Sequence, residues 1–66
     1  MASYYVNDDA QANGDHEVHV SNCTYFPSRR TYLGEFSSCA PAVTEAKKKW
    51  SKSNGCYYCC RACHTS

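Results

Sequence analysis

The segment that decides the fold is Cys56-Tyr57-Tyr58-Cys59-Cys60-Arg61-Ala62-Cys63, which holds four of the six cysteines of this 66-residue chain. It contains two consecutive Cys-x2-Cys pairs, Cys56 with Cys59 and Cys60 with Cys63. A turn of this spacing brings two thiolates to one metal ion, and its backbone N–H groups stabilise their charge. The segment therefore predicts that cross-linking, by a metal or by disulfides, organises the fold.

The rest of the composition makes such a cross-link necessary. A chain of 66 residues forms one domain, and a domain of this size has only a marginal core. Aliphatic side chains are few, so metal or disulfide bonds have to supplement the core. We expect a single domain over residues 1–66, with an N-terminal strand and loop over 1–15 and a Cys-rich α+β core over 16–66.

No apolar run in the sequence is long enough for a transmembrane helix, so we expect no membrane association. The first residues lack the charged and apolar regions of a secretory signal, which predicts a cytoplasmic protein. The alternative is a secreted protein whose signal has been removed. We further expect a monomer.

The net charge of +1 hides an uneven distribution. Residues 1–23 carry four acidic and no basic side chains, whereas all seven Lys and Arg residues lie in 24–66. A solvated helix face explains most such clusters. The alternative is weak binding to a nucleic-acid backbone without base specificity. The lysines that would supply it are Lys47, Lys48, Lys49 and Lys52.

Short strands are predicted at residues 3–6, 17–20 and 31–36, where aromatic and β-branched residues gather or alternate with polar ones. The spacing favours antiparallel pairing of 17–20 with 31–36. Gly34 indicates a bulge in the last of these strands.

A helix is predicted over residues 38–52. It begins after two serines that can cap it, and Pro41 falls in its first turn. Asn54-Gly55 is expected to end it as a turn or left-handed cap. One face of this helix would hold Cys39, Val43, Ala46 and Trp50. The fold class is thus a small α+β unit, a short antiparallel sheet packed on one helix with a C-terminal Cys knuckle stapled by metal, disulfides or both.

A metal site is one interpretation of the cysteines. His19-x3-Cys23, at a strand end, and a tail Cys-x2-Cys pair together supply four ligands for tetrahedral zinc. Three disulfides are the alternative, because six cysteines is an even number. Only Cys23 and Cys39 are distant partners for four tail cysteines, however, so one bridge would have to close within the tail. Free or redox-active thiols are the third interpretation.

The stretch from 19 to 63 contains a series of short motifs. They are His19-Val-Ser-Asn-Cys23-Thr-Tyr25-Phe-Pro27, Tyr32-Leu33-Gly34-Glu35-Phe36-Ser37-Ser38, an Ala-containing helix, Gly55 and Cys60-Arg61-Ala62-Cys63. Through these motifs the stretch resembles the small metal-binding domain of the Ada methylphosphotriester-repair family, a module that some bacterial nucleases carry as well. The whole chain, with its Gly-Asp-His-Glu-Val-His and Gly-Cys-Tyr-Tyr-Cys blocks, also resembles short uncharacterised bacterial Cys-rich proteins.

The resemblance implies one zinc ion, with Cys59 as the substitute should Cys60 not be a ligand, since the family's glycine spacing points to Cys59. Cys39 has no counterpart in the family; it is expected either to bridge to Cys56 or Cys59 or to be buried. Methyl transfer is not expected, because the position of the accepting cysteine is His19 here. The expected metal ligands are His19, Cys23, Cys60 and Cys63.

No paired carboxylates and no glycine-rich phosphate loop are visible, so we expect a protein that is not an enzyme. The leading hypothesis is a small zinc-binding module with a mainly structural ion and an unknown partner. A disulfide-stapled secreted or envelope peptide of the toxin or effector kind is the alternative. A thiol redox or metal-handling protein is a further alternative.

Overall fold

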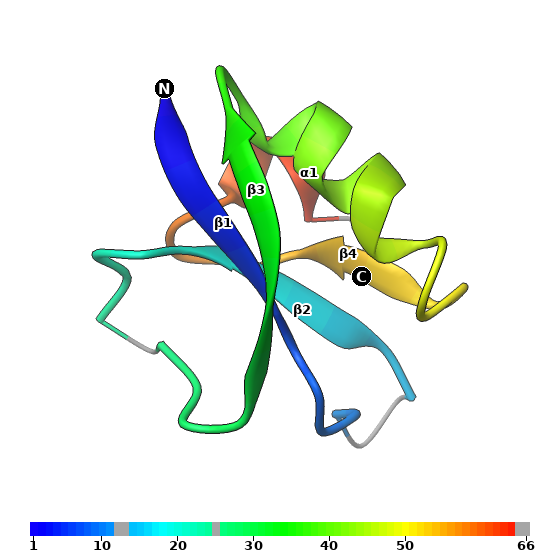
Figure 1. The fold of residues 1–66 in the computed structure, drawn as a ribbon. Helices are drawn as coiled ribbons and strands as arrows, with labels where there is room; N and C mark the ends of the chain where they lie inside the picture. The colour runs from blue at the N-terminus through cyan, green and yellow to red at the C-terminus, as the bar shows by residue number, and fades with distance from the viewer. Residues whose placement is uncertain (12–13, 25, 65–66) are drawn as a thin grey trace.

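A four-stranded sheet and one α-helix form the architecture of the protein (Figure 1). The computed structural model describes residues 1–11, 14–24 and 26–64. Its elements are β1 (Ala2–Asn7), β2 (His16–Val20), β3 (Arg30–Phe36), α1 (Cys39–Ala46), β4 (Ser53–Gly55) and a 3-10 turn (Arg61–Cys63). The predicted small α+β class is confirmed.

The order of the strands across the sheet is β3-β1-β2-β4. β1 is antiparallel to both of its neighbours, whereas β4 runs parallel to β2, so the sheet is mixed. The predicted direct pairing of 17–20 with 31–36 is wrong, because β1 lies between these strands. β1 has a neighbouring strand on each side, and its residues Tyr4 and Val6 are buried.

A bulge interrupts the β1–β3 ladder, as the sequence predicted from Gly34. Tyr4 pairs with Gly34 and Tyr5 with Tyr32, which leaves Leu33 as the extra residue of β3. Gly34 has a φ of 125°, a backbone angle that residues with a side chain rarely adopt. A bulge of this kind bends the strand that carries the extra residue, and α1 contacts this strand.

Helix α1 packs on one face of the sheet and contacts all four strands (Figure 1). Val43 and Ala46 face the core, as the helical period predicted. Apart from Tyr4, the side chains that this core buries are small or medium in size: Val6, Val18, Ala42, Val43 and Ala46, together with the sulfur-bearing Cys23, Cys56 and Cys60.

The helix ends at Ala46, earlier than the predicted residue 52. The N–H groups of Lys48 and Lys49 bond to the carbonyls of Glu45 and Ala46, three residues back, which tightens the last turn and stops the helix. The chain then reverses into β4. Trp50, expected on the helix face, lies beyond the helix but still packs against the core.

β4 was not predicted, and its residues Ser53, Asn54 and Gly55 are all buried. The Ser53 hydroxyl donates to the Trp50 carbonyl over 2.6 Å, and the Asn54 amide donates to Asp15 over 2.7 Å. Gly55 is not the left-handed cap that the sequence suggested, since among the described glycines only Gly14 and Gly34 have positive φ. It is instead a strand residue under the tail.

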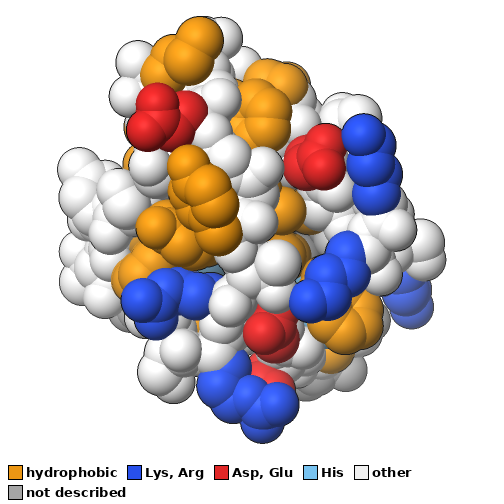
Figure 2. Space-filling model, in the orientation of Figure 1, with side chains coloured by type: hydrophobic (Ala, Val, Ile, Leu, Met, Phe, Trp, Pro, Cys, Tyr) orange, Lys and Arg blue, Asp and Glu red, His pale blue; other side chains and the backbone are white. Residues whose placement is uncertain are grey.

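Basic side chains are spread over the visible surface. On the face in Figure 2, Lys and Arg groups lie apart, with Asp and Glu groups between them. Lys48 pairs with Glu45 over 3.1 Å, and Lys49 lies 3.8 Å from Asp8. Nucleic-acid binding by the lysines stays a prediction. Within the described ranges, no helix has the length and apolar character needed to cross a membrane.

Candidate metal centre

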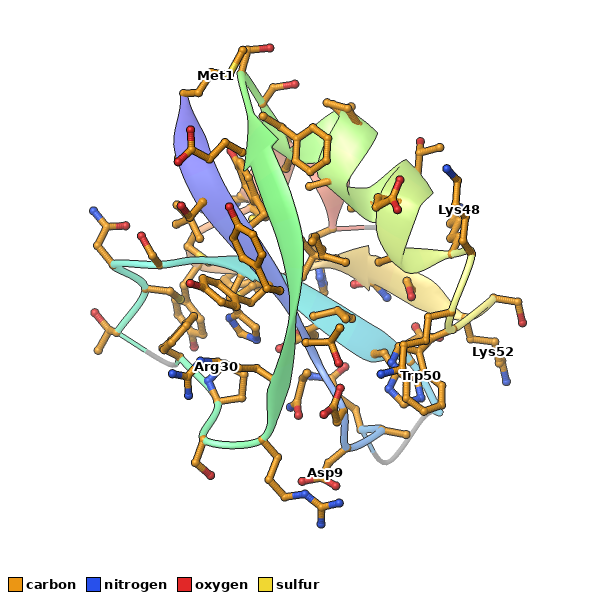
Figure 3. All side chains as sticks on the ribbon, viewed as in Figure 1. Met1, Asp9, Arg30, Lys48, Trp50 and Lys52 are labelled. Carbon is orange, nitrogen blue, oxygen red and sulfur yellow. A yellow bond between two sulfur atoms is a disulfide. The ribbon has the colours of Figure 1, made fainter. Side chains whose placement is uncertain are left out.

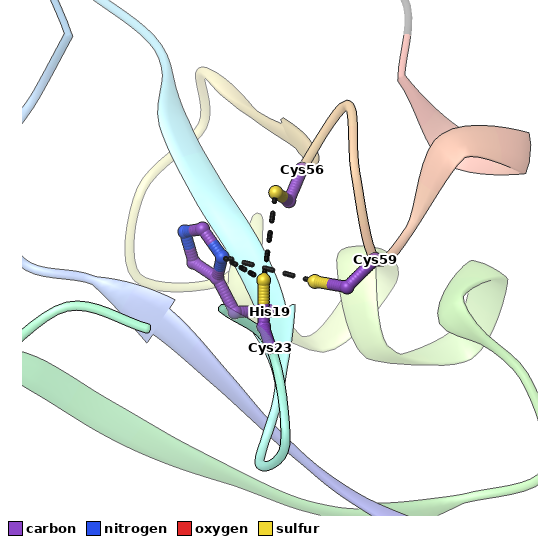
Figure 4. A group of neighbouring side chains, drawn as sticks. All are labelled: His19, Cys23, Cys56 and Cys59. Atoms are coloured by element: carbon purple, nitrogen blue, oxygen red, sulfur yellow. Dashed lines mark hydrogen bonds between the residues drawn. The ribbon is translucent and has the colours of Figure 1, made fainter. Parts of the chain in front are cut away.

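The parallel pairing of β2 with β4 creates the candidate metal centre. Because the two strands are parallel, their C-terminal ends lie at the same end of the sheet, where the Cys56 N–H donates to the Val18 carbonyl over 2.9 Å. His19 lies on β2, and Cys23 follows in the turn after it. Cys56 comes directly after β4, and Cys59 lies in the next turn. Segments far apart in the sequence therefore bring four donor side chains to one place (Figure 4).

The distances in this group match a tetrahedral ion. His19 Nδ1 lies 3.5 Å from Cys23 Sγ and 3.8 Å from Cys59 Sγ. The sulfurs of Cys23 and Cys56 lie 3.9 Å apart, and all four donor atoms lie within 4.8 Å of one another. Zinc with bonds of about 2.3 Å to sulfur and about 2.0 Å to nitrogen separates two sulfurs by roughly 3.8 Å and nitrogen from sulfur by roughly 3.5 Å.

The group is shielded from solvent. His19, Cys23 and Cys56 are buried, with His19 only 2% exposed, and Cys59 is half-buried. Burial raises the pKa of the Cys59 thiol, and a hydrogen bond with Cys23 adds to the effect, although a backbone hydrogen bond from Val20 opposes it. Burial also lowers the pKa of His19, against the influence of Glu17. Burial therefore favours the neutral forms of the Cys59 thiol and the His19 imidazole, and a bound cation would offset the cost of a buried thiolate.

Neighbouring groups orient the donors. Glu17 Oε1 lies 3.6 Å from His19 Nε2, which favours a proton on Nε2 and leaves the lone pair of Nδ1 directed toward the sulfurs, free to bind a metal ion. The Tyr58 N–H donates to Cys56 Sγ over 3.4 Å, as backbone groups do in a Cys-x2-Cys turn. Both contacts prepare the group to bind a cation.

The structure brings together three residues that the sequence singled out, His19, Cys23 and the substitute Cys59. It adds Cys56, which sequence reasoning had not counted as a ligand. Cys60 is buried with its sulfur 3.9 Å from that of Cys59, but it is outside the four-residue group. The two consecutive tail pairs have the same spacing, so the spacing alone does not reveal that the first pair faces His19.

Cys63 was predicted as a ligand, and this is wrong because Cys63 forms a disulfide with Cys39. The expected bridge from Cys39 to Cys56 or Cys59 is wrong for the same reason. The 3-10 turn at 61–63 carries Cys63 back to the start of α1, whereas Cys56 is fixed at the end of β4. The disulfide thus pins the tail to the helix, and the thiols of Cys23, Cys56, Cys59 and Cys60 are free.

Two other histidines lie outside the group. His16 stacks on Trp50 with ring centroids 4.1 Å apart, and its Nδ1 lies 2.9 Å from the Asn7 carbonyl. His64 Nδ1 lies 3.1 Å from the Gly55 carbonyl. Tyr25, which belongs to one of the motifs shared with the Ada family, lies outside the described residues.

Comparison of the chain with known protein families, with curated proteins and with solved structures finds no match. The resemblance to the Ada module consequently stands on the short motifs alone, and the function has to be argued from the site.

Proposed function

We propose that the protein is a small zinc-binding module without catalytic activity, in which the ion is structural. The observation that carries this proposal is the group of one imidazole nitrogen and three thiol sulfurs within 4.8 Å of one another. One nitrogen and three sulfurs are a common donor set of structural zinc sites, which use all four positions and leave none open for a substrate.

The chemistry of the donors supports zinc in particular. Thiolate and imidazole ligands in a tetrahedral arrangement suit zinc better than calcium or magnesium, which prefer oxygen. The small core supports a structural role, because the binding free energy of a metal becomes folding free energy when the unfolded chain has no preformed site. The ion would join β2 and the turn after it to the segment that follows β4.

The test is the metal content of the protein purified under mild conditions, measured by elemental analysis and by native mass spectrometry. We expect one zinc ion per chain, and we expect excess chelator to loosen the tail and reduce the thermal stability. A metal-free protein that stays metal-free after incubation with zinc would contradict the proposal.

Cys56 and Cys60 provide a matched pair of variants. Both thiols are free and almost fully buried, at 1% and 3% exposure, but only Cys56 belongs to the donor group. We expect Cys56→Ser to weaken zinc binding by more than about 100-fold and Cys60→Ser to change it little. Equal losses in the two variants, or a larger loss in Cys60→Ser, would refute this assignment of ligands.

A second candidate, a disulfide-stapled secreted or envelope peptide, is supported by the Cys39–Cys63 bridge, since stable disulfides belong to oxidising compartments. In that case the four remaining thiols would be oxidised as well. The mass of the denatured, unreduced protein separates the candidates: one disulfide lowers it by two hydrogens, and three disulfides lower it by six.

A further inference from the structure

A second feature, at the other end of β2, is a surface pocket of about 220 Å³. It lies where the loop before β2 meets the segment between α1 and β4, and the metal centre lies at the opposite end of β2. In Figure 3, Trp50 and Lys52 lie together in this region. The residues that line the pocket are Gly14, His16, Lys49, Trp50, Ser51 and Lys52.

The pocket has a positive lining. It includes two lysines and no acidic side chain. Lys49 is held in position, since its Nζ donates to the Thr31 hydroxyl over 2.8 Å and lies 3.8 Å from Asp8. Lys52 has no ion pair with the residues that the structure describes, and its Nζ lies beside Gly14, where a Cβ would come within 3.3 Å of it. One ammonium group is thus partly neutralised and the other is available.

The Trp50 side chain forms part of the wall of this pocket. Its indole Nε1 is buried and has no hydrogen-bond partner in the described part of the chain. His16 stacks on the indole at an interplanar angle of 4°, which covers one face of the ring. Lys49 Nζ lies 5.3 Å from the centroid of the same ring, so this ammonium group is close to the Trp50 wall of the pocket.

We propose that this pocket binds a phosphate monoester, with the ammonium groups of Lys49 and Lys52 around the phosphate oxygens and the Trp50 ring as part of the wall. Two ammonium groups match the two negative charges of a phosphate monoester better than the single charge of a carboxylate. The volume holds a phosphate group with a small substituent and is below the range of drug-sized ligands. The monoester has two sources, a small phosphorylated metabolite or the terminal phosphate of a nucleic-acid strand.

Trp50 is the only tryptophan of the chain, so its fluorescence reports binding directly. The probes are glycerol 2-phosphate, inorganic phosphate and acetate, each titrated at constant ionic strength, with isothermal calorimetry as a second readout. We expect saturable binding of glycerol 2-phosphate and of phosphate, and none of acetate. Absence of saturable phosphate binding in both measurements, or equal binding of acetate, would overturn the proposal.

Lys52→Gln and Lys48→Gln are matched variants, because each removes one positive charge and Lys48 lies outside the pocket, paired with Glu45. We expect Lys52→Gln to weaken phosphate binding at least about five-fold, as loss of one charged hydrogen bond does, and Lys48→Gln to leave it unchanged. Equal effects of the two substitutions would show general charge attraction and would refute a built site.

Two short oligonucleotides, one with a 5′-phosphate and one without, distinguish the sources. Preference for the phosphorylated strand over glycerol 2-phosphate supports a strand terminus, and the reverse supports a small metabolite. Equal binding of both strands would assign the contact to phosphate diesters and would contradict a monoester site. None of these outcomes depends on the metal centre, so failure here and failure of the zinc proposal are distinguishable.

Discussion

Gly55→Ala is the most informative single substitution, because Gly55 lies under the tail that carries Cys56 and Cys59. A Cβ at this position would overlap the Cys60 carbonyl oxygen and would lie 2.7 Å from the Cβ of Cys63 and 2.9 Å from that of Cys60. Carbon atoms prefer separations of about 3.5–4.0 Å, so the tail has to move outward by about 1 Å.

Overpacking of this kind costs about 1–3 kcal/mol, and the atoms in the way are backbone and Cβ atoms that do not rotate aside. Alanine also lowers the conformational entropy of the unfolded chain, which offsets about 0.4–1 kcal/mol of this loss of stability. We therefore expect a net loss of about 1–2 kcal/mol in the free energy of unfolding. Because the movement separates the tail from β2, we also expect weaker metal binding.

The assay combines urea unfolding of the zinc-loaded protein with the visible absorption spectrum of the cobalt-substituted protein, which reports tetrahedral thiolate ligands. Gly34→Ala is the control. It disturbs a backbone with a φ of 125°, but it lies on β3, away from the donors. We expect it to lower stability and to leave the cobalt spectrum intact. An unchanged unfolding midpoint and an unchanged spectrum in Gly55→Ala would refute the packing of the tail on β4.

Three further predictions concern pH, the disulfide and the core. Zinc should dissociate as the pH falls, because binding displaces protons from the thiols. In the metal-free protein the pKa of His19 is lowered, so the unfolded chain takes up its proton first and stability should fall below about pH 6.5. The pKa of Cys59 is raised, so the unfolded chain loses its proton first and stability should fall above about pH 8.5; thermal unfolding at a series of pH values measures both effects. A Cys39→Ser/Cys63→Ser double variant should lose about 3 kcal/mol of stability, since the bridge spans a sequence separation of 24, but it should keep its zinc; loss of zinc would return Cys63 to the ligands. Val43→Asp should unfold the domain through an unpaired buried charge, at a cost of more than about 4 kcal/mol, and a native circular dichroism spectrum for this variant would contradict the described core.

Local patterns predicted the elements well, but not their neighbours. The alternation of residues 17–20, the aromatic content of 3–6 and the serines before Cys39 each act within a few residues, and strands and a helix lie there, although Ser38 occupies the N-cap position without a side-chain capping bond. The central position of β1 depends on which strand pairs with a neighbour on both sides, and long-range packing decides that. No local pattern carries this information.

The same limit explains the donor set. His19 and Cys23 are recognisable because both lie at the end of one strand. The choice of Cys56 over Cys60 follows from the parallel pairing of β4, and β4 is a polar segment of three residues without strand periodicity. Once β4 is paired, Cys56 is the first tail cysteine to arrive beside β2, and Cys63 is left to meet the helix.

The bulge at Leu33 and Gly34 also affects how this sheet meets other chains. β3 is one open edge of the sheet, and a regular edge strand offers its free backbone groups to any strand that approaches it. The bulge breaks that regular row of groups, and the charged side chains of Arg30 and Glu35 lie on the same strand. The opposite edge, β4, has only three residues. Neither edge gives a second copy a long template, which protects a protein with so small a core from strand-to-strand aggregation.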